Sequence, residues 1–251
     1  MPTEYLRKAR KIREKEGICG VFKRIIYKLI FYYRIRTGLR TLKYYLAYHF
    51  LNLFKSERPM FILNGKKYIA FRHWYNATWR NERAVEIPVI LDKIKENRDK
   101  KILEIGDVIR HYADFPRDIL DKYEKGGEII NEDVADFKPA QKYDLIVSVS
   151  TLEHVGWDEE VKDPLKIIRA LENLKNNCLT QGGEIVATIP LGYNPPMDEL
   201  LMTGKIPFVE KYFLKRVFED SWRQITEKEA AGAKYGTPFP AANVVVFGVI
   251  N

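Results

Sequence analysis

The stretch at residues 143–154, YDLIVSVSTLEH, constrains the fold of this chain more than any other. Leu145, Ile146 and Val147 form an apolar run that predicts a buried strand. Polar side chains gather where this strand ends: Ser148, Ser150, Thr151, Glu153 and His154. In a parallel α/β sheet, ligands bind at the carboxyl ends of the strands. The sequence therefore predicts that this strand ends at the floor of a site.

Further strands and helices are expected on both sides of this stretch. Strands are predicted at residues 101–105, 117–121, 128–131, 184–190, 211–217 and 243–250. Residues 81–97 favour a helix that is kinked or starts late because it contains Pro88, and residues 163–179 favour a second helix before a turn at 181–183. Strands separated by helix-length connections indicate a doubly wound sheet. We therefore expect an α/β, Rossmann-like fold with a seven-stranded, mostly parallel sheet.

The basic residues of the chain are concentrated at its N-terminus. The net charge is +8, yet residues 1–58 hold fifteen Lys and Arg against four Asp and Glu, which leaves −3 for residues 59–251. Asn64-Gly65, between the apolar runs of residues 59–71, predicts a β-hairpin that opens the second part. We therefore expect a basic helical extension at 1–58 and an α/β domain at 59–251. Because the main domain is mildly acidic, nucleic acid is not an expected partner.

The N-terminal extension has an amphipathic pattern that several partners would fit. Residues 4–16 favour a short helix, and residues 21–54 alternate apolar and aromatic side chains with cations at helical spacing, with a break near Thr37-Gly38. One interpretation is an interfacial helix on anionic lipid. Another is a helical hairpin that packs on the main domain or on a second subunit of a homo-oligomer, and RNA contact is a third.

No segment of the sequence predicts secretion or a membrane span. The first residues lack the apolar core of a signal peptide, and no stretch approaches 18 apolar residues. Cys19 and Cys178 give neither a disulfide framework nor metal-ligand spacing, so we expect free thiols and no metal. We expect a cytoplasmic protein whose extension is the candidate for peripheral contact with the inner face of the membrane.

Polar residues follow three of the other predicted strands as well. Gly106 follows the first strand, where a glycine would let a ligand approach the backbone. Asp121 ends the second strand and has the place of an acid that accepts ribose hydroxyls. After the third strand, residues 131–134 offer an amide or an acid to an adenine amino group. With residues 148–154, these positions predict one nucleotide-like site along a single edge of the sheet.

These segments resemble the class I S-adenosylmethionine-dependent methyltransferases over residues 80–251. The matching segments are KILEIGDV, DILDKYE, NEDVADF, YDLIVSVSTLEHVGWDE and LTQGGEIVATIPLGYNP. The resemblance implies S-adenosyl-L-methionine as cofactor and a glycan or other small acceptor. By it, the cofactor-binding residues are Glu104 and Gly106 at the methionine end, Asp121 at the ribose, Asp133 and Val134 at the adenine, and Ser148 and Ser150 at the sulfonium. Glu153 and His154 would lie beside the methyl group.

One motif departs from the pattern of that family. The family has E-x-G-x-G-x-G after its first strand, whereas here Gly106 is followed by Asp107, Val108, Ile109 and Arg110. Without the later glycines, side chains such as Asp107, His111 or Tyr112 must take over part of the cofactor contact, or the cofactor binds weakly or not at all.

The predicted catalytic residues are His154, Glu153 and Asp158. Methyl transfer to a hydroxyl requires alignment and removal of a proton, and histidine is the side chain best suited to accept that proton at neutral pH. Glu153 or Asp158 would orient His154 or replace it, and the alternative is a histidine that only packs against the cofactor. Two other functions stay open: a nicotinamide dehydrogenase, which the missing G-x-G-x-x-G disfavours, and a non-catalytic scaffold with a methyltransferase-like fold.

Overall fold

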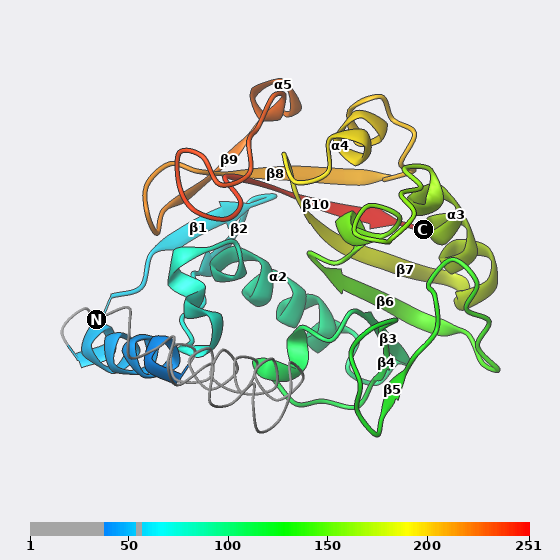
Figure 1. Cartoon of the computed structure of the whole chain (residues 1–251), viewed down its shortest axis with the longest axis horizontal. Coiled ribbons are helices and arrows are strands. Elements are labelled where there is room, and N and C mark those ends of the chain that lie inside the picture. Colours follow the sequence, from blue (N-terminus) through cyan, green and yellow to red (C-terminus); the bar gives the residue numbers. More distant parts are fainter. Residues whose placement is uncertain (1–37, 54–56) are drawn as a thin grey trace, which may run out of the picture. The chain divides into compact units, whose positions relative to one another are not determined.

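The computed structural model describes residues 38–53 and 57–251 (Figure 1). The helix expected at 4–16 and the segment 21–37 lie outside the described residues. Contacts divide the chain into two units, residues 1–54 and 55–251, and each is described by itself.

Residues 38–53 of the first unit form a helix. Leu39, Leu42, Leu46 and Leu53 are all more than half exposed. Their spacing of three, four and seven residues puts them on one face of the helix. Within the described residues, no helix is long and apolar enough to cross a membrane.

The second unit is built on an eight-stranded sheet with the order β5-β4-β3-β6-β7-β10-β8-β9. The strands are β3 (Ile102–Ile105), β4 (Asp118–Leu120), β5 (Ile129–Ile130), β6 (Tyr143–Val149), β7 (Leu179–Pro190), β8 (Glu210–Arg216), β9 (Trp222–Ile225) and β10 (Val244–Ile250). The first five strands of this order, from β5 through β4, β3 and β6 to β7, run parallel to one another. The last three, β10, β8 and β9, each pair antiparallel with their neighbours. The fold is α/β with a mostly parallel core sheet, as expected.

The order of the strands reverses between β3 and β6. From β3 the chain moves outward through β4 and β5 and then returns to place β6 on the other side of β3. Ligands of open α/β sheets bind in the crevice at the carboxyl ends of the strands at such a point. The fold therefore places the ends of β3 and β6 together, with Ile105 in register with Ser148.

Helices cover both faces of the parallel strands, which explains why β6 is apolar on both sides. Helix α2 (Arg83–Glu96) packs Ile87, Ile90 and Ile94 against Leu145, Val147 and Val149. Helix α3 (Lys166–Asn173) and helix α4 (Pro195–Met202) pack on the opposite face, in one cluster with Ile146, Ile185 and Ala187. A short helix α5 (Glu227–Ala230) lies near the C-terminal strands.

A hairpin precedes α2 at the predicted Asn64-Gly65 turn. Strands β1 (Met60–Leu63) and β2 (Lys66–Ile69) pair antiparallel, and Figure 1 shows them beside α2. Pro88 lies inside α2 and has no N–H to donate to the carbonyl of Ala84. That carbonyl instead accepts a hydrogen bond from the N–H of Phe71 at 2.7 Å. The proline thus creates the acceptor that ties the segment after the hairpin to α2.

Some elements differ from those predicted. The sheet has eight strands rather than the predicted seven. The additional one is β9, a short edge strand. The second helix ends at Asn173 and continues as a π-helical turn, η4 (Leu174–Cys178), and the turn predicted at 181–183 lies within β7 beside a register shift. The connections after β3, β4 and β5 contain no α-helix; the first holds only the 3-10 turn η2 (Ile109–His111).

Candidate functional site

A cavity of about 330 Å³ lies at the carboxyl ends of β3, β4, β5 and β6. Its volume falls in the range of small-molecule sites. The lining comes from four segments: Ile105–Val108, Leu120–Glu124, Glu132–Val134, and Ser150, Thr151, His154, Val155 and Glu159. All four follow strands that meet at the reversal point, so the cavity lies where the strand order predicts a ligand.

The structure brings most of the predicted site residues to this cavity. Those in its wall are Gly106, Asp121, Asp133, Val134, Ser150 and His154. Glu104, Ser148, Glu153 and Asp158 do not line it. Among these, Ser148 is fully buried in β6, and its Oγ has no hydrogen-bond partner within the described part of the chain.

Glu104 lies under the loop that replaces the glycine-rich turn. Its Oε1 accepts the N–H groups of Val108 and Ile109 at 2.9 and 2.6 Å, and its Oε2 accepts Nε–H of Arg117 at 2.5 Å. Burial raises the pKa of Glu104, although these donors oppose the shift. In the structure the carboxylate of Glu104 is occupied by donors from the loop and from Arg117, and its assignment to the methionine end of a cofactor stays a prediction.

The backbone conformation of Gly106 and its contact with Thr151 leave no room for a side chain at this position. Its φ of +83° lies in the left-handed region, and a Cβ at this position would lie 2.3 Å from Oγ1 of Thr151. Thr151 follows β6 and starts the short 3-10 turn η3 (Leu152–His154). The missing side chain therefore lets the ends of β3 and β6 approach closely beside the cavity.

Asp121 organises the loop after β4. Its Oδ1 accepts the N–H groups of Tyr123 and Glu124, both at 2.8 Å, and its Oδ2 accepts the N–H of Asp107 at 3.3 Å. A carboxylate has about four acceptor positions. Three backbone bonds therefore leave this residue, in the cavity wall, capacity for a ligand hydroxyl.

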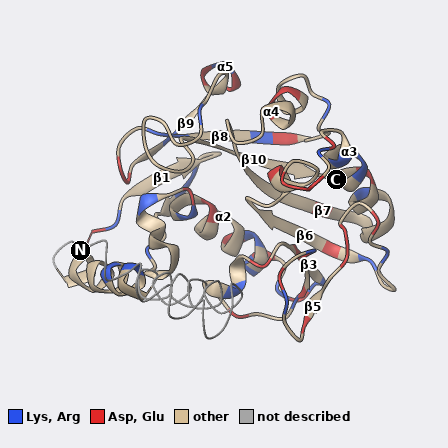
Figure 2. Ribbon diagram, viewed as in Figure 1, with Lys and Arg blue, Asp and Glu red and all other residues tan. Residues whose placement is uncertain are grey.

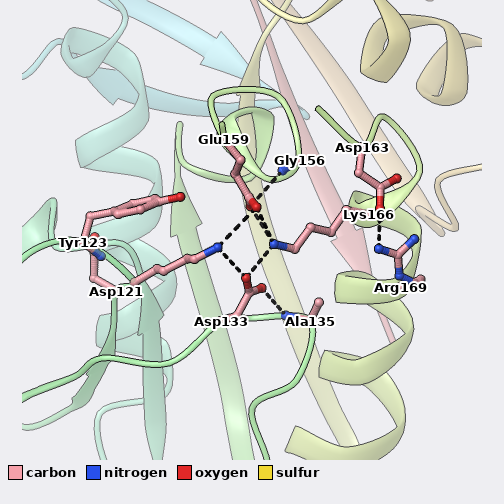
Figure 3. A network of polar contacts seen from close by, with 10 residues as sticks. Asp121, Tyr123, Asp133, Ala135, Gly156, Glu159, Asp163, Lys166 and Arg169 are labelled. Atoms are coloured by element: carbon pink, nitrogen blue, oxygen red, sulfur yellow. Dashed lines mark hydrogen bonds and ion pairs between the residues drawn. The ribbon is translucent and has the colours of Figure 1, made fainter. Parts of the chain in front are cut away.

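Asp133 belongs to a network of two lysines and two carboxylates (Figure 3). Lys166 Nζ lies 2.5 Å from Asp133 Oδ2 and 2.6 Å from Glu159 Oε1, and Lys122 Nζ bridges the same two carboxylates at 2.8 and 3.2 Å. Burial alone would raise the pKa of Asp133, but the lysine hydrogen bonds outweigh it and lower the pKa to about 2. Asp133 is thus already paired where an adenine contact was predicted.

His154 is held by two neighbouring side chains at the other end of the cavity. Its Nδ1 lies 2.5 Å from Asp158 Oδ2, which also accepts the hydroxyl of Tyr193 at 2.6 Å. Burial favours a higher pKa for Asp158, but the bonds from Tyr193 and His154 outweigh it and lower the pKa. When Nδ1–H donates to Asp158, the lone pair of the ring is on Nε2. His154 is therefore arranged to accept a proton at Nε2.

Glu153 does not line the cavity and is buried near the charges of Glu86, Arg83 and Glu82. Its side chain is 2% exposed, and its Oε1 lies 3.6 Å from Nε2 of His154. Burial is the main cause that raises its pKa well above the usual value, and Glu86 adds to it. The environment therefore favours the neutral acid over a carboxylate base.

Helix α2 and the residue before it, Glu82, supply charged side chains that the sequence did not predict for the site. Ser150, with φ of +41°, donates from Oγ to Glu86 Oε1 at 2.5 Å. Arg83 donates to Glu86 Oε2 at 2.5 Å, and Glu82 Oε2 accepts the N–H of Ala242 at 3.0 Å. The one sequence signal for this group was the position of Glu86 between two apolar residues, Val85 and Ile87. The structure shows that both of these neighbours are fully buried.

Comparisons with known proteins give similarity in solved structures alone. No family model and no curated protein matches this chain. The N-methyltransferase NodS from Bradyrhizobium japonicum WM9, in complex with S-adenosyl-L-homocysteine, is 15% identical, with a TM-score of 0.43 over 67% of this chain and 85% of that chain. An S-adenosylmethionine-dependent methyltransferase from Clostridium acetobutylicum ATCC 824 is 10% identical, with a TM-score of 0.36 over 65% and 89% of the two chains. Because the similarity is this low, the function must be argued from the chemistry of the site.

The bond between Glu104 and Arg117 gives a stability prediction. Replacing Arg117 by methionine leaves a buried carboxylate without its cation, so the free energy of unfolding should fall by roughly 3–5 kcal/mol in urea denaturation. The matched control is Arg98→Met, whose side chain is 78% exposed, with an expected change within about 0.5 kcal/mol. Equal stabilities of the two variants would show that Glu104 does not depend on Arg117.

Proposed function

We propose that this protein is an S-adenosyl-L-methionine-dependent methyltransferase. The observation that supports this most is the charge of the cavity. Its wall contains one lysine, Lys122, and six carboxylates: Asp107, Asp121, Glu124, Glu132, Asp133 and Glu159. Lys166 joins Lys122 in pairing with Asp133 and Glu159, which leaves the rest of the wall negative.

A negative cavity discriminates between the cofactors that such a fold can bind. S-adenosyl-L-methionine carries a sulfonium, an ammonium and one carboxylate, so its net charge is positive. A nicotinamide dinucleotide carries a diphosphate, which this wall would repel in a medium of low dielectric constant. The loop after β3 also lacks the glycines that let a backbone approach a pyrophosphate. Both arguments favour the methyl donor over the dehydrogenase cofactor.

The residues at the end of β6 suit removal of a proton from a hydroxyl acceptor. The bound cofactor supplies an activated methyl group for in-line displacement. Nε2 of His154 would take the proton of the acceptor hydroxyl when the methyl group is transferred to its oxygen and the sulfonium leaves as a neutral thioether. Asp158 then stabilises the imidazolium through Nδ1–H, and Tyr193 fixes Asp158.

A sugar or another small glycan is the acceptor class that we propose. Aromatic rings continue from His154, whose ring centroid lies 4.9 Å from that of Tyr193, which lies 5.3 Å from that of Tyr235. Such rings offer apolar faces with polar edges, as in many small-molecule sites. The −3 charge of residues 59–251 disfavours a nucleic acid.

We also propose that the helix at 38–53 contacts an anionic membrane surface from the cytoplasmic side, where a lipid-linked glycan would be presented. Arg40 and Lys43 are the only Lys or Arg residues in this helix, which has no Asp or Glu (Figure 2). The exposed stripe of Leu39, Leu42, Leu46 and Leu53 gives the helix an apolar face. An apolar face with cations nearby is the pattern of interfacial helices.

The proton-transfer role gives the first functional prediction. His154→Ala should lower transfer of labelled methyl groups from S-adenosyl-L-methionine to a panel of soluble sugars and nucleotide sugars by about 10²- to 10⁴-fold, because the acceptor loses its base. Cofactor affinity, measured by calorimetry, should fall far less. His49→Ala, on the exposed helix, serves as the control. Undiminished transfer by the His154 variant would exclude the base role.

The membrane proposal gives a second prediction. The double variant Leu42→Ser/Leu46→Ser should float with phosphatidylserine vesicles roughly tenfold less than the unmodified chain, because two leucines no longer bury apolar surface in the bilayer. Ile62→Ser, an exposed apolar residue of β1, is the matched control and should float normally. If the double variant and the unmodified chain float to the same extent, the helix does not mediate membrane contact.

A further inference from the structure

A short segment between β7 and α4 contacts the residues around His154. Tyr193 donates from its hydroxyl to Asp158 Oδ2 at 2.6 Å, and its ring lies edge-on to that of His154. Asn194 donates from Nδ2 to the carbonyl of Glu153 at 2.7 Å. The surroundings of His154 therefore depend on how this segment is held.

Gly192, the residue before Tyr193, brings this segment against a second loop. Its φ of +85° lies in the left-handed region, and a Cβ there would lie 2.5 Å from the backbone nitrogen of Tyr235 and 2.6 Å from the carbonyl oxygen of Ala233. The ring centroids of Tyr193 and Tyr235 are 5.3 Å apart. The backbone at Gly192 thus sets where the ring of Tyr193 lies.

Asp198, in the first turn of α4, holds the backbone of Gly192. Its Oδ2 accepts the N–H of Gly192 at 2.7 Å. Burial raises the pKa of Asp198 to about 6, although the N–H of Gly192 opposes the shift. Because this value exceeds the ordinary 3.8, folding stability falls as the pH rises between the two values and stays low at neutral pH. The charge at Asp198 therefore does not serve stability, but a charged acceptor fixes Gly192 more strongly than a neutral one would.

We propose that Asp198 is a positioning residue for His154. It fixes Gly192 and hence the hydroxyl of Tyr193, which in turn fixes Asp158, so that the imidazole proton stays on Nδ1. The inference rests on the proposed function, in which Nε2 of His154 takes the proton of the acceptor. Asp198 does not line the cavity, and it acts through the segment after β7.

NMR signals of the histidine ring nitrogens report the tautomer of His154 in the full chain without a cofactor or an acceptor. Spectra are recorded at alkaline pH, where histidine rings are neutral, and His154→Ala identifies the signals of this ring. In the unmodified chain the Nδ1–H form should predominate. Asp198→Ala should lower the ratio of the Nδ1–H to the Nε2–H form by roughly 2- to 10-fold, because Asp158 loses part of its support. Asp198→Asn keeps an acceptor oxygen for Gly192 and should restore most of the ratio.

Two further variants support this comparison. Tyr193→Phe removes the hydroxyl that reaches Asp158 and should lower the ratio as much as Asp198→Ala does. Unchanged ring signals of His73 and His111 show that a variant is folded. If Asp198→Ala does not fold, Asp198→Leu removes the acceptor and fills the space.

Glu199→Ala is the matched control, because it removes an exposed carboxylate from the next position of α4 and should leave the ratio unchanged. If Asp198→Ala keeps the ratio of the unmodified chain, or if the Nε2–H form predominates in the unmodified chain, the inference is overturned while the proposed function stands. If calorimetry shows that the unmodified chain does not bind S-adenosyl-L-methionine, the proposed function fails and the inference fails with it.

Discussion

The buried carboxylate of Glu104 is the interaction on which the rest of the site depends. It lies at the end of β3, where a glycine-rich loop would supply N–H groups to a ligand, and it accepts two of those N–H groups itself. Arg117, which precedes β4, compensates the charge. The loop between β3 and β4 is thereby fixed at both ends, and Gly106 and Asp107 are held at the cavity wall. Since a buried ion pair costs desolvation free energy, its worth here is in positioning more than in stability.

The distribution of charge around the cavity follows from this scaffold. Two lysines neutralise the end formed by Asp133 and Glu159, whereas Asp121 relies on backbone N–H groups and Asp107 on a partly exposed arginine. The wall is therefore nearly neutral at one end and negative toward the middle. At the far end Asp158 contacts Nδ1 of His154, and Nε2 of the same ring lies 3.6 Å from Oε1 of the buried Glu153. This arrangement is the basis of our proposal of a cationic cofactor and a hydroxyl acceptor.

The sequence predicted the parallel strands well because their signals are local. Residues 143–149 form β6 as expected, and β3, β4, β5, β8 and β10 lie within one residue of the predicted bounds. Strand β9 was missed because it is a four-residue edge strand whose two buried residues, Trp222 and Ile225, do not alternate. The length of β7 was underestimated because glycines at 182 and 183 signal a turn, yet they lie within the strand.

Side-chain partners were the part that the sequence could not give. Six of the ten predicted residues line the cavity, because strand order alone sets where their backbone lies. The partners of Glu104 and Asp133, and the environment of Glu153, depend on residues distant in sequence, such as Arg117, Lys166 and Glu86. The position of a residue along its strand thus predicted whether it lies near the cavity. Which side chains pair with each carboxylate could be known only from the folded chain.

The central claim is that the negative cavity selects a cationic methyl donor. Calorimetric titration of the full chain with S-adenosyl-L-methionine and, separately, with oxidised nicotinamide adenine dinucleotide tests it most directly. The account predicts saturable, micromolar binding of S-adenosyl-L-methionine and no binding of the dinucleotide. Preference for the dinucleotide, or binding of neither as expected of a non-catalytic scaffold, would contradict it.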